Sequence, residues 1–149
     1  MAILNYTTSI ATSVTLAEIQ EMLAKAGAQA IMQEFDSGVV TCLSFRMMLP
    51  NGAVFFKLPC NIQGVHKSLK ASKSKSLRPK HRTIEQAART AWRIVKDWVE
   101  AQLAMIEAEQ ADTIELFLPF AQSSDGRTVY ETLKQSEFKM LSHEGNSNA

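Results

Sequence analysis

The sequence predicts an α+β fold in which a three-stranded antiparallel sheet packs against helices. The chain has 149 residues, and its apolar share of 46% is enough for one domain with a true core. Three strand-like runs, residues 28–35, 39–48 and 53–58, are separated by short turns containing glycine, which favours a β-meander over parallel strands. Apolar residues recur at helical spacing before and after these runs, so helices should flank the sheet.

The first elements expected are a strand and a helix. Residues 3–10 are rich in Thr, Tyr and Ile, which suits an edge strand. The segment 15–18 is a capping box in which Thr15 accepts the N–H of Glu18 and Glu18 reaches back to Thr15. An apolar helical face follows, and Gly27 supplies a left-handed stop. We therefore expect a helix from residue 15 to 26.

The strands that follow should present two different faces. In the middle strand the odd-numbered residues from Val39 to Met47 are expected to face the helices, and the even-numbered residues, Arg46 among them, to face away. In the third strand Phe55 and Lys57 point opposite to Phe56. Arg46, Phe55 and Lys57 are therefore expected to share the outer face.

The C-terminal half is predicted to be helical. A capping box at Thr83 opens the longest helix, to about residue 109, and residues 114–118 read as a short helix ended by Pro119. A further capping box at Thr128 opens a short helix to about residue 135. Beyond it Lys, Ser, Asn and Gly dominate, so we expect one domain over residues 1–135 and a disordered tail over 136–149.

Charge is distributed unevenly along the chain. Residues 37–84 contain nine Lys and Arg and no Asp or Glu, although the net charge is only +1. The densest part, residues 65–82, is rich in Ser and Lys, so we expect a basic loop that is mobile when free. Such segments bind polyanions by releasing counterions from phosphates. The alternative is a solvated linker that its charge keeps soluble.

Three groups of basic side chains are the candidate nucleic-acid contacts: two on the outer sheet face, seven in the loop, and three on a ridge of the long helix. They are Arg46, Lys57, Lys67, Lys70, Lys73, Lys75, Arg78, Lys80, Arg82, Arg89, Arg93 and Lys96. Phe55 is expected to stack a base if it is exposed. For the ridge, the alternative is a solvated helix face that pairs locally with Asp97 and Glu100.

Catalysis is not indicated by the sequence. A metal-dependent nuclease would need carboxylates beside Lys57, and residues 37–84 contain none. The three histidines with Cys42 and Cys60 lack the spacing of a zinc site, and neither cysteine has an orienting acid near it for nucleophilic chemistry. We expect two reduced core cysteines and no catalytic residue, metal or cofactor.

Targeting and membrane signals are also missing from the sequence. There is no run of about 18 apolar residues that could span a bilayer, and the N-terminus lacks the pattern of a secretory signal. The expectation is a soluble protein of the cytoplasm.

The order helix, three antiparallel strands, basic loop and alanine-rich helix resembles the double-stranded RNA-binding domain, over about residues 15–99. In that family the loop and the start of the second helix carry lysines that hold phosphates. Here Lys75, Arg78, Lys80 and Arg82 precede Thr83, and Ala87, Ala88 and Ala91 lie where such domains pack small residues. The chain departs from the family in its N-terminal strand, its longer loop and its two added helices.

Residues 87–104, with 117–120 and 126–130, resemble small uncharacterised proteins of phages and other mobile elements. That resemblance implies phage DNA metabolism, recombination or interference with host defence, in a bacterial cytoplasm. The leading hypothesis is a non-enzymatic nucleic-acid-binding protein, with strandedness open and a homodimer possible. The alternatives are an inhibitor that binds a host defence protein, of the anti-CRISPR type, and a sponge for signal nucleotides.

Overall fold

The computed structural model describes residues 2–143 and confirms the α+β fold. One antiparallel sheet is formed by β1 (Ala30–Asp36), β2 (Val39–Leu49) and β3 (Gly52–Lys57), with β2 in the centre. The turn between β1 and β2 places Ser37 and Gly38 at φ of 52° and 80°, the left-handed pair that a two-residue hairpin turn requires. The expected β-meander is therefore present, with strand bounds close to those predicted.

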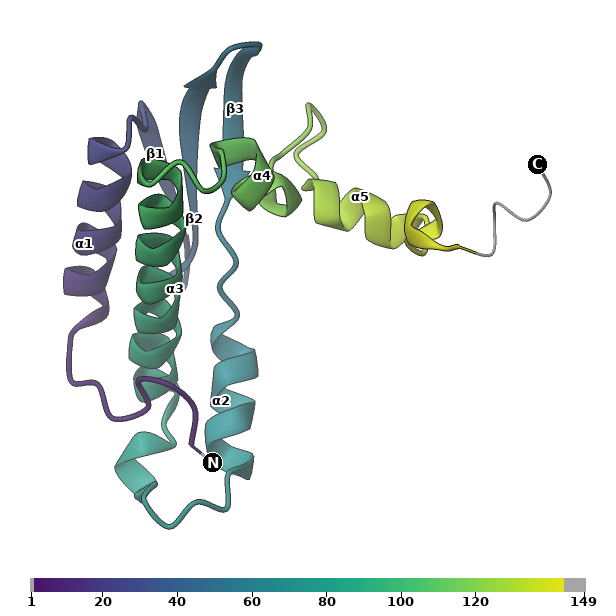
Figure 1. The fold of residues 1–149 in the computed structure, drawn as a ribbon. Coiled ribbons are helices and arrows are strands. Elements are labelled where there is room, and N and C mark those ends of the chain that lie inside the picture. Colours follow the sequence, from purple (N-terminus) through teal and green to yellow (C-terminus); the bar gives the residue numbers. More distant parts are fainter. Residues whose placement is uncertain (1, 144–149) are drawn as a thin grey trace.

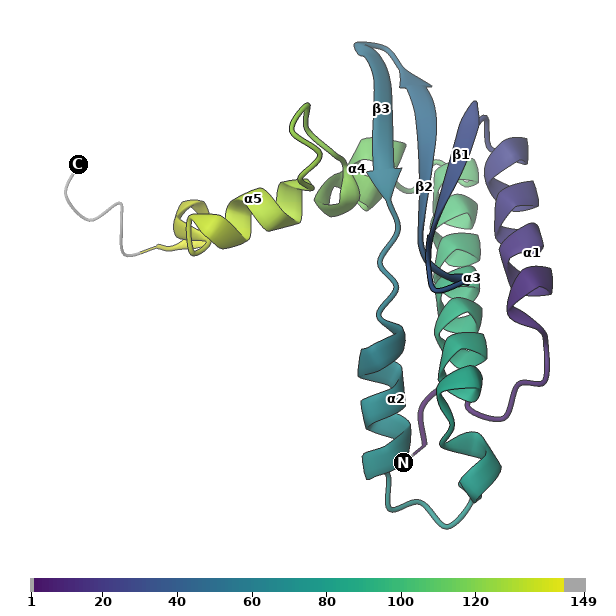
Figure 2. The same cartoon turned by 180° about the vertical axis from the view of Figure 1, so that it is seen from behind.

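Helices occupy one side of this sheet. The two long ones, α1 (Thr12–Lys25) and α3 (Ile84–Glu107), lie side by side against it, as Figure 1 shows. A further helix, α2 (Ile62–Ala71), follows β3 and packs on α3 below the sheet. Seen from behind, α2 and the strands lie together in front of α3 (Figure 2). The molecule thus has two layers, α1 with α3 and the sheet with α2.

The main core lies between these layers. Aromatic rings fill its centre: Phe45 stacks on Phe56 with ring centroids 5.2 Å apart, and Phe117 meets Phe45 edge-on at 5.6 Å. Such geometries suit the ring quadrupole. The buried residues of this core are Leu16, Ile19, Leu23, Leu43, Phe45, Met47, Phe56, Leu58, Trp92, Val95, Val99, Phe117 and Ala121.

The N-terminal segment is not the edge strand that the sequence predicts. Residues 4–7 form turns, and the segment lies across α3. The Gln86 side chain donates to the backbone carbonyls of Tyr6 and Thr8, both at 2.9 Å, and the Thr90 hydroxyl donates to the carbonyl of Asn5 at 3.1 Å. Side chains of α3 thereby replace the strand partner that these carbonyls would otherwise need.

Helix α1 begins three residues earlier than predicted, and its expected capping box is absent. Thr15 is fully buried inside the helix and accepts a hydrogen bond from Arg93 at 3.4 Å. Glu18 pairs with the same guanidinium at 2.8 Å instead of reaching back to Thr15. The predicted stop is confirmed: Gly27 has a φ of 105°, and the N–H of Ala28 bonds to the carbonyl of Leu23 at 2.9 Å.

The predicted helices of the C-terminal half are present. Thr83 and Thr128 each accept the backbone N–H three residues on, at 3.1 Å, at the starts of α3 and of α5 (Val129–Gln135). Helix α4 (Thr113–Phe117) runs into a 3₁₀ turn, Leu118–Phe120, that contains the expected proline. Of the predicted disordered tail, the structure describes residues 136–143, where Lys139–Leu141 form a 3₁₀ turn. The remainder, 144–149, lies outside the described residues.

Two adjacent phenylalanines on opposite sides of β3 test this arrangement. Phe56 is 0% exposed in the core, whereas Phe55 is 44% exposed on the outer face. We expect Phe56→Ala to lower the free energy of unfolding by about 3–5 kcal/mol, because it leaves a cavity. Phe55→Ala should cost about 1 kcal/mol or less. Urea unfolding followed by circular dichroism measures both, and equal losses would contradict the assigned faces.

Candidate nucleic-acid interface

Residues 62–82, called here the basic lobe, are folded, and their first half is a helix where a loop was expected. The side chain of Asn61 accepts the N–H of Gly64 at 2.9 Å and opens α2. Ile62, Val65 and Leu69 recur three and four residues apart and pack towards α3. The prediction of an irregular loop from residue 65 is therefore wrong for α2, because this apolar stripe outweighs the charge around it.

A small second core holds the basic lobe to the body. Leu69 of α2 and Leu77 of the following turn are buried against Ala87, the fully buried small residue at the start of α3. Ile3 and Tyr6 of the N-terminal segment close it from the other side. Burying a leucine contributes about 1.5–3 kcal/mol, so Leu69 and Leu77 favour the packing of the basic lobe on α3.

Arg82 ties the end of the basic lobe to α2. Its guanidinium donates to the backbone carbonyls of Leu69 at 2.6 Å and Ser72 at 2.8 Å, with longer bonds to Lys70 and Leu77. These carbonyls belong to the last turn of α2 and the residues after it, which have no partner within the helix. A cation at a helix C-terminus is also favoured by the helix dipole. Arg82 is therefore a structural residue as well as a candidate phosphate contact.

Both histidines of the basic lobe have structural partners too. The Nε2 of His66 lies 3.1 Å from the carbonyl oxygen of Arg82, and the Nδ1 of His81 accepts the N–H of Arg78 at 3.1 Å. The ring of His81 also meets that of Tyr6 edge-on, with centroids 5.5 Å apart. These contacts hold the short 3₁₀ helix Pro79–His81 against the N-terminal segment.

The remaining cations of the basic lobe are exposed. None of them makes an ion pair with any residue in the range 2–143. They are Lys67, Lys70, Lys73, Lys75, Arg78 and Lys80, and we call them the six lobe cations. The fold therefore leaves six like charges from residues 67–80 exposed and without ion-pair partners in this range.

The helix ridge is engaged internally. The Arg89 guanidinium donates to Oε1 of Gln86 at 2.7 Å, and Arg93 bonds to Glu18 with 16% of its side chain exposed. Lys96, with a side chain 17% exposed, pairs with Glu100 on the same helix and lies 3.9 Å from Asp97. Lys96 therefore follows the alternative predicted from the sequence, in which the ridge pairs locally with Asp97 and Glu100. Arg93 instead pairs with Glu18 of α1.

Arg46, Phe55 and Lys57 share the outer face of the sheet, as expected. Arg46 lies directly opposite Phe55 in the register of β2 and β3, and its guanidinium carbon is 5.9 Å from the centre of that ring. This is a cation–π distance. Lys57 lies two residues further along β3, opposite Ser44. These two cations reach the surface on a different element from the six lobe cations.

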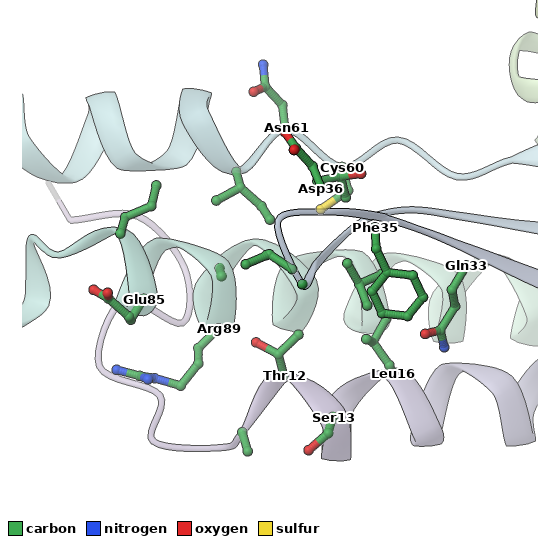
Figure 3. Close-up of a pocket in the computed structure, with 18 of the residues that line it drawn as sticks. Thr12, Ser13, Leu16, Gln33, Phe35, Asp36, Cys60, Asn61, Glu85 and Arg89 are labelled. Carbon is green, nitrogen blue, oxygen red and sulfur yellow. The ribbon is translucent and has the colours of Figure 1, made fainter.

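A further feature of the surface is a cleft of about 980 Å³. It lies between the start of α1, the end of the β1–β2 hairpin, residues 60–63 and the first turns of α3 (Figure 3). Phe35 and Leu16 give it an apolar wall, and its charged side chains are Asp36, Glu85 and Arg89. With two carboxylates and one guanidinium, this cleft gives no support to a basic pocket for signal nucleotides.

The two cysteines are free thiols with weak acidity. Cys42 is buried under the outer face and Cys60 is half-buried beside the cleft. Burial raises the pKa of Cys60 to about 12, and burial followed by a hydrogen bond to Glu34 raises the pKa of Cys42. Neither is therefore a thiolate near neutral pH. Among residues 2–143, no cluster of three or more His, Cys, Asp or Glu is placed to hold a metal.

Comparisons of the chain with protein-family models, with curated proteins and with solved structures find no match. Within the described part of the chain, no helix is both long and apolar enough to cross a bilayer.

Removing the guanidinium of Arg82 should loosen the basic lobe. We expect Arg82→Ala to lower the free energy of unfolding by about 2–3 kcal/mol, since carbonyls lose a charged donor. Amide hydrogen exchange should accelerate in α2 and leave α1 unchanged. Lys75→Ala, an exposed change in the same lobe, is the control and should shift stability by less than about 0.5 kcal/mol. Unchanged amide hydrogen exchange in α2 would contradict the conclusion that Arg82 holds this helix in place.

The raised pKa of Cys60 gives stability a defined pH dependence. In the unfolded chain a thiol ionises near pH 8.5, whereas Cys60 in the fold keeps its proton to about pH 12. Stability should fall as pH rises from about 8.5 to 12, because the unfolded state binds fewer protons. Between pH 7 and pH 9.5 the free energy of unfolding should fall by about 1 kcal/mol less in Cys60→Ala than in the wild-type protein. Urea unfolding at several pH values measures this difference. If the stability of both proteins falls equally with pH, Cys60 does not have a raised pKa.

Proposed function

We propose that this protein is a non-enzymatic nucleic-acid-binding protein that grips phosphates with its basic lobe. The observation that carries the proposal is the set of six lobe cations, which the fold exposes together without acidic partners among the described residues. Like charges held on one surface repel each other, and phosphates relieve that repulsion. Phosphate binding also releases counterions from the nucleic acid, which makes affinity strong at low salt.

The folded state of the basic lobe supports the proposal. Arg82 and the second core place Lys67, Lys70 and the following turn on a fixed support. Cations on a fixed support lose less conformational freedom on binding than cations on a floppy loop. The resemblance to phage and mobile-element proteins adds a setting to the proposal, the cytoplasm of a bacterial host.

Salt dependence tests the phosphate contacts directly. Binding of a fluorescently labelled oligonucleotide, measured by anisotropy from about 50 to 300 mM salt, should give a log–log slope of about −4 to −5 for six contacts. The triple variant Lys67→Gln, Lys70→Gln, Lys73→Gln should reduce the steepness of that slope by about 2–3. Binding that does not depend on salt would contradict the proposal, and so would no binding at all.

A matched control separates a local site from net charge. The triple variant Lys25→Gln, Lys134→Gln, Lys139→Gln removes the same charge from exposed positions outside the basic lobe. It should leave the slope unchanged, and an equal effect of both triples would refute the site. A partner protein captured from nuclease-treated lysate through the six lobe cations, without nucleic-acid binding, would favour the inhibitor alternative.

A further inference from the structure

The outer face of the sheet is apolar and open. The helices α1 and α3 cover the other face, and no helix in the described range lies over this one (Figure 2). Met32 is 52% exposed there, Met48 60% and Phe55 44%. Adjacent strands bring these side chains around Arg46, since Met48 follows it by two residues and Phe55 lies opposite. The face thus combines apolar surface with a cation at its centre.

Arg46 is held there with unused hydrogen-bonding capacity. Its guanidinium sits over the Phe55 ring, and its Nε is buried without a hydrogen-bond partner among residues 2–143. A buried donor without an acceptor costs free energy, about 1–3 kcal/mol. Arg46 also makes no ion pair with the described residues, so its positive charge is available to an anion. Lys57 adds a second cation beside it, while the acid of this face, Glu34, lies on β1 across from Cys42.

We propose that this face binds single-stranded nucleic acid, with an unpaired base stacked on Phe55 and its backbone held by Arg46 and Lys57. The inference rests on the proposed function and adds the strandedness of the ligand. Bases inside a duplex are covered by their neighbours, so an exposed aromatic ring can stack only on an unpaired base. Cations flanking an aromatic platform are the usual complement to a single strand.

The sheet face and the basic lobe can serve the same strand. Helix α2 continues from β3 in the same layer, as both views show. Ile62, Val65 and Leu69 turn towards α3, and Lys67, five residues after Ile62, points about 140° away from it. Lys67 therefore faces the same side as Phe55. From Lys57 to Lys67 the chain spans at most about 25 Å, within the reach of a site of about 4–16 nucleotides.

Substitutions at residue 55, compared on a single-stranded oligonucleotide and the matching duplex, test the inference. Phe55→Ala should weaken single-strand binding about 5- to 100-fold and leave duplex binding unchanged. Phe55→Tyr keeps a ring and should retain wild-type affinity. Val14→Ala, on α1 and 49% exposed to solvent, is the apolar control away from this face and should change neither. In Phe55→Trp the new indole fluorescence should be quenched by the single strand, which reports stacking.

The outcomes separate the two proposals. No binding to either oligonucleotide overturns the proposed function, and the inference with it. Binding through the six lobe cations that is equal for both forms and insensitive to Phe55→Ala overturns the inference alone. A dimer in sedimentation analysis that Phe55→Ala dissociates, with single-strand affinity unchanged, would assign the face to a second copy of the chain and overturn the inference as well.

Discussion

The packing of α3 against several neighbours at once is the constraint on which the rest of the structure depends. Trp92, Val95 and Val99 form part of the main core, and Ala87 forms part of the second core under α2. Its polar side chains are used too, since Gln86 and Thr90 hold the N-terminal segment and Arg93 holds α1. The sheet, α1, the N-terminal segment and the basic lobe therefore all contact this one helix.

This support divides the basic residues into two kinds. Arg82 and Arg93 bind groups of the protein itself, so their charge stabilises the fold. The six lobe cations stay at the surface. The overall charge of the chain conceals that division, because the acids that bring the net charge to +1 lie outside residues 37–84. A protein of nearly zero net charge can in this way carry a strongly positive surface. The long-range attraction of an anion depends on this local surface charge more than on the net charge.

Local signals predicted much of the fold, and non-local contacts explain the errors. The turn at Ser37 and Gly38 is present as expected. At Thr83 and Thr128 the threonine half of each predicted capping box is present, and these signals all act within a few residues. The strand predicted over 3–10 fails because Gln86, about 80 residues away, takes its carbonyls. The role of Arg93 is hidden in the same way, because its partner Glu18 is 75 residues away. The carbonyls that Arg82 binds lie only 5 to 13 residues before it, but the contact depends on the fold of α2 and the following turn. Helix α2 was recognisable, since Ile62, Val65 and Leu69 repeat at helical spacing, but the average composition of the segment obscured it.

The tether formed by Arg82 implies that one basic stretch evolves under two different constraints. Its guanidinium meets carbonyls from four residues in a fixed geometry, which a lysine with a single ammonium group cannot reproduce. In the proposed function the exposed cations around it would act mainly through their number, because attraction to a polyanion is insensitive to their exact order. Related chains should therefore be free to move or exchange their surface lysines, while an arginine at this one place is retained.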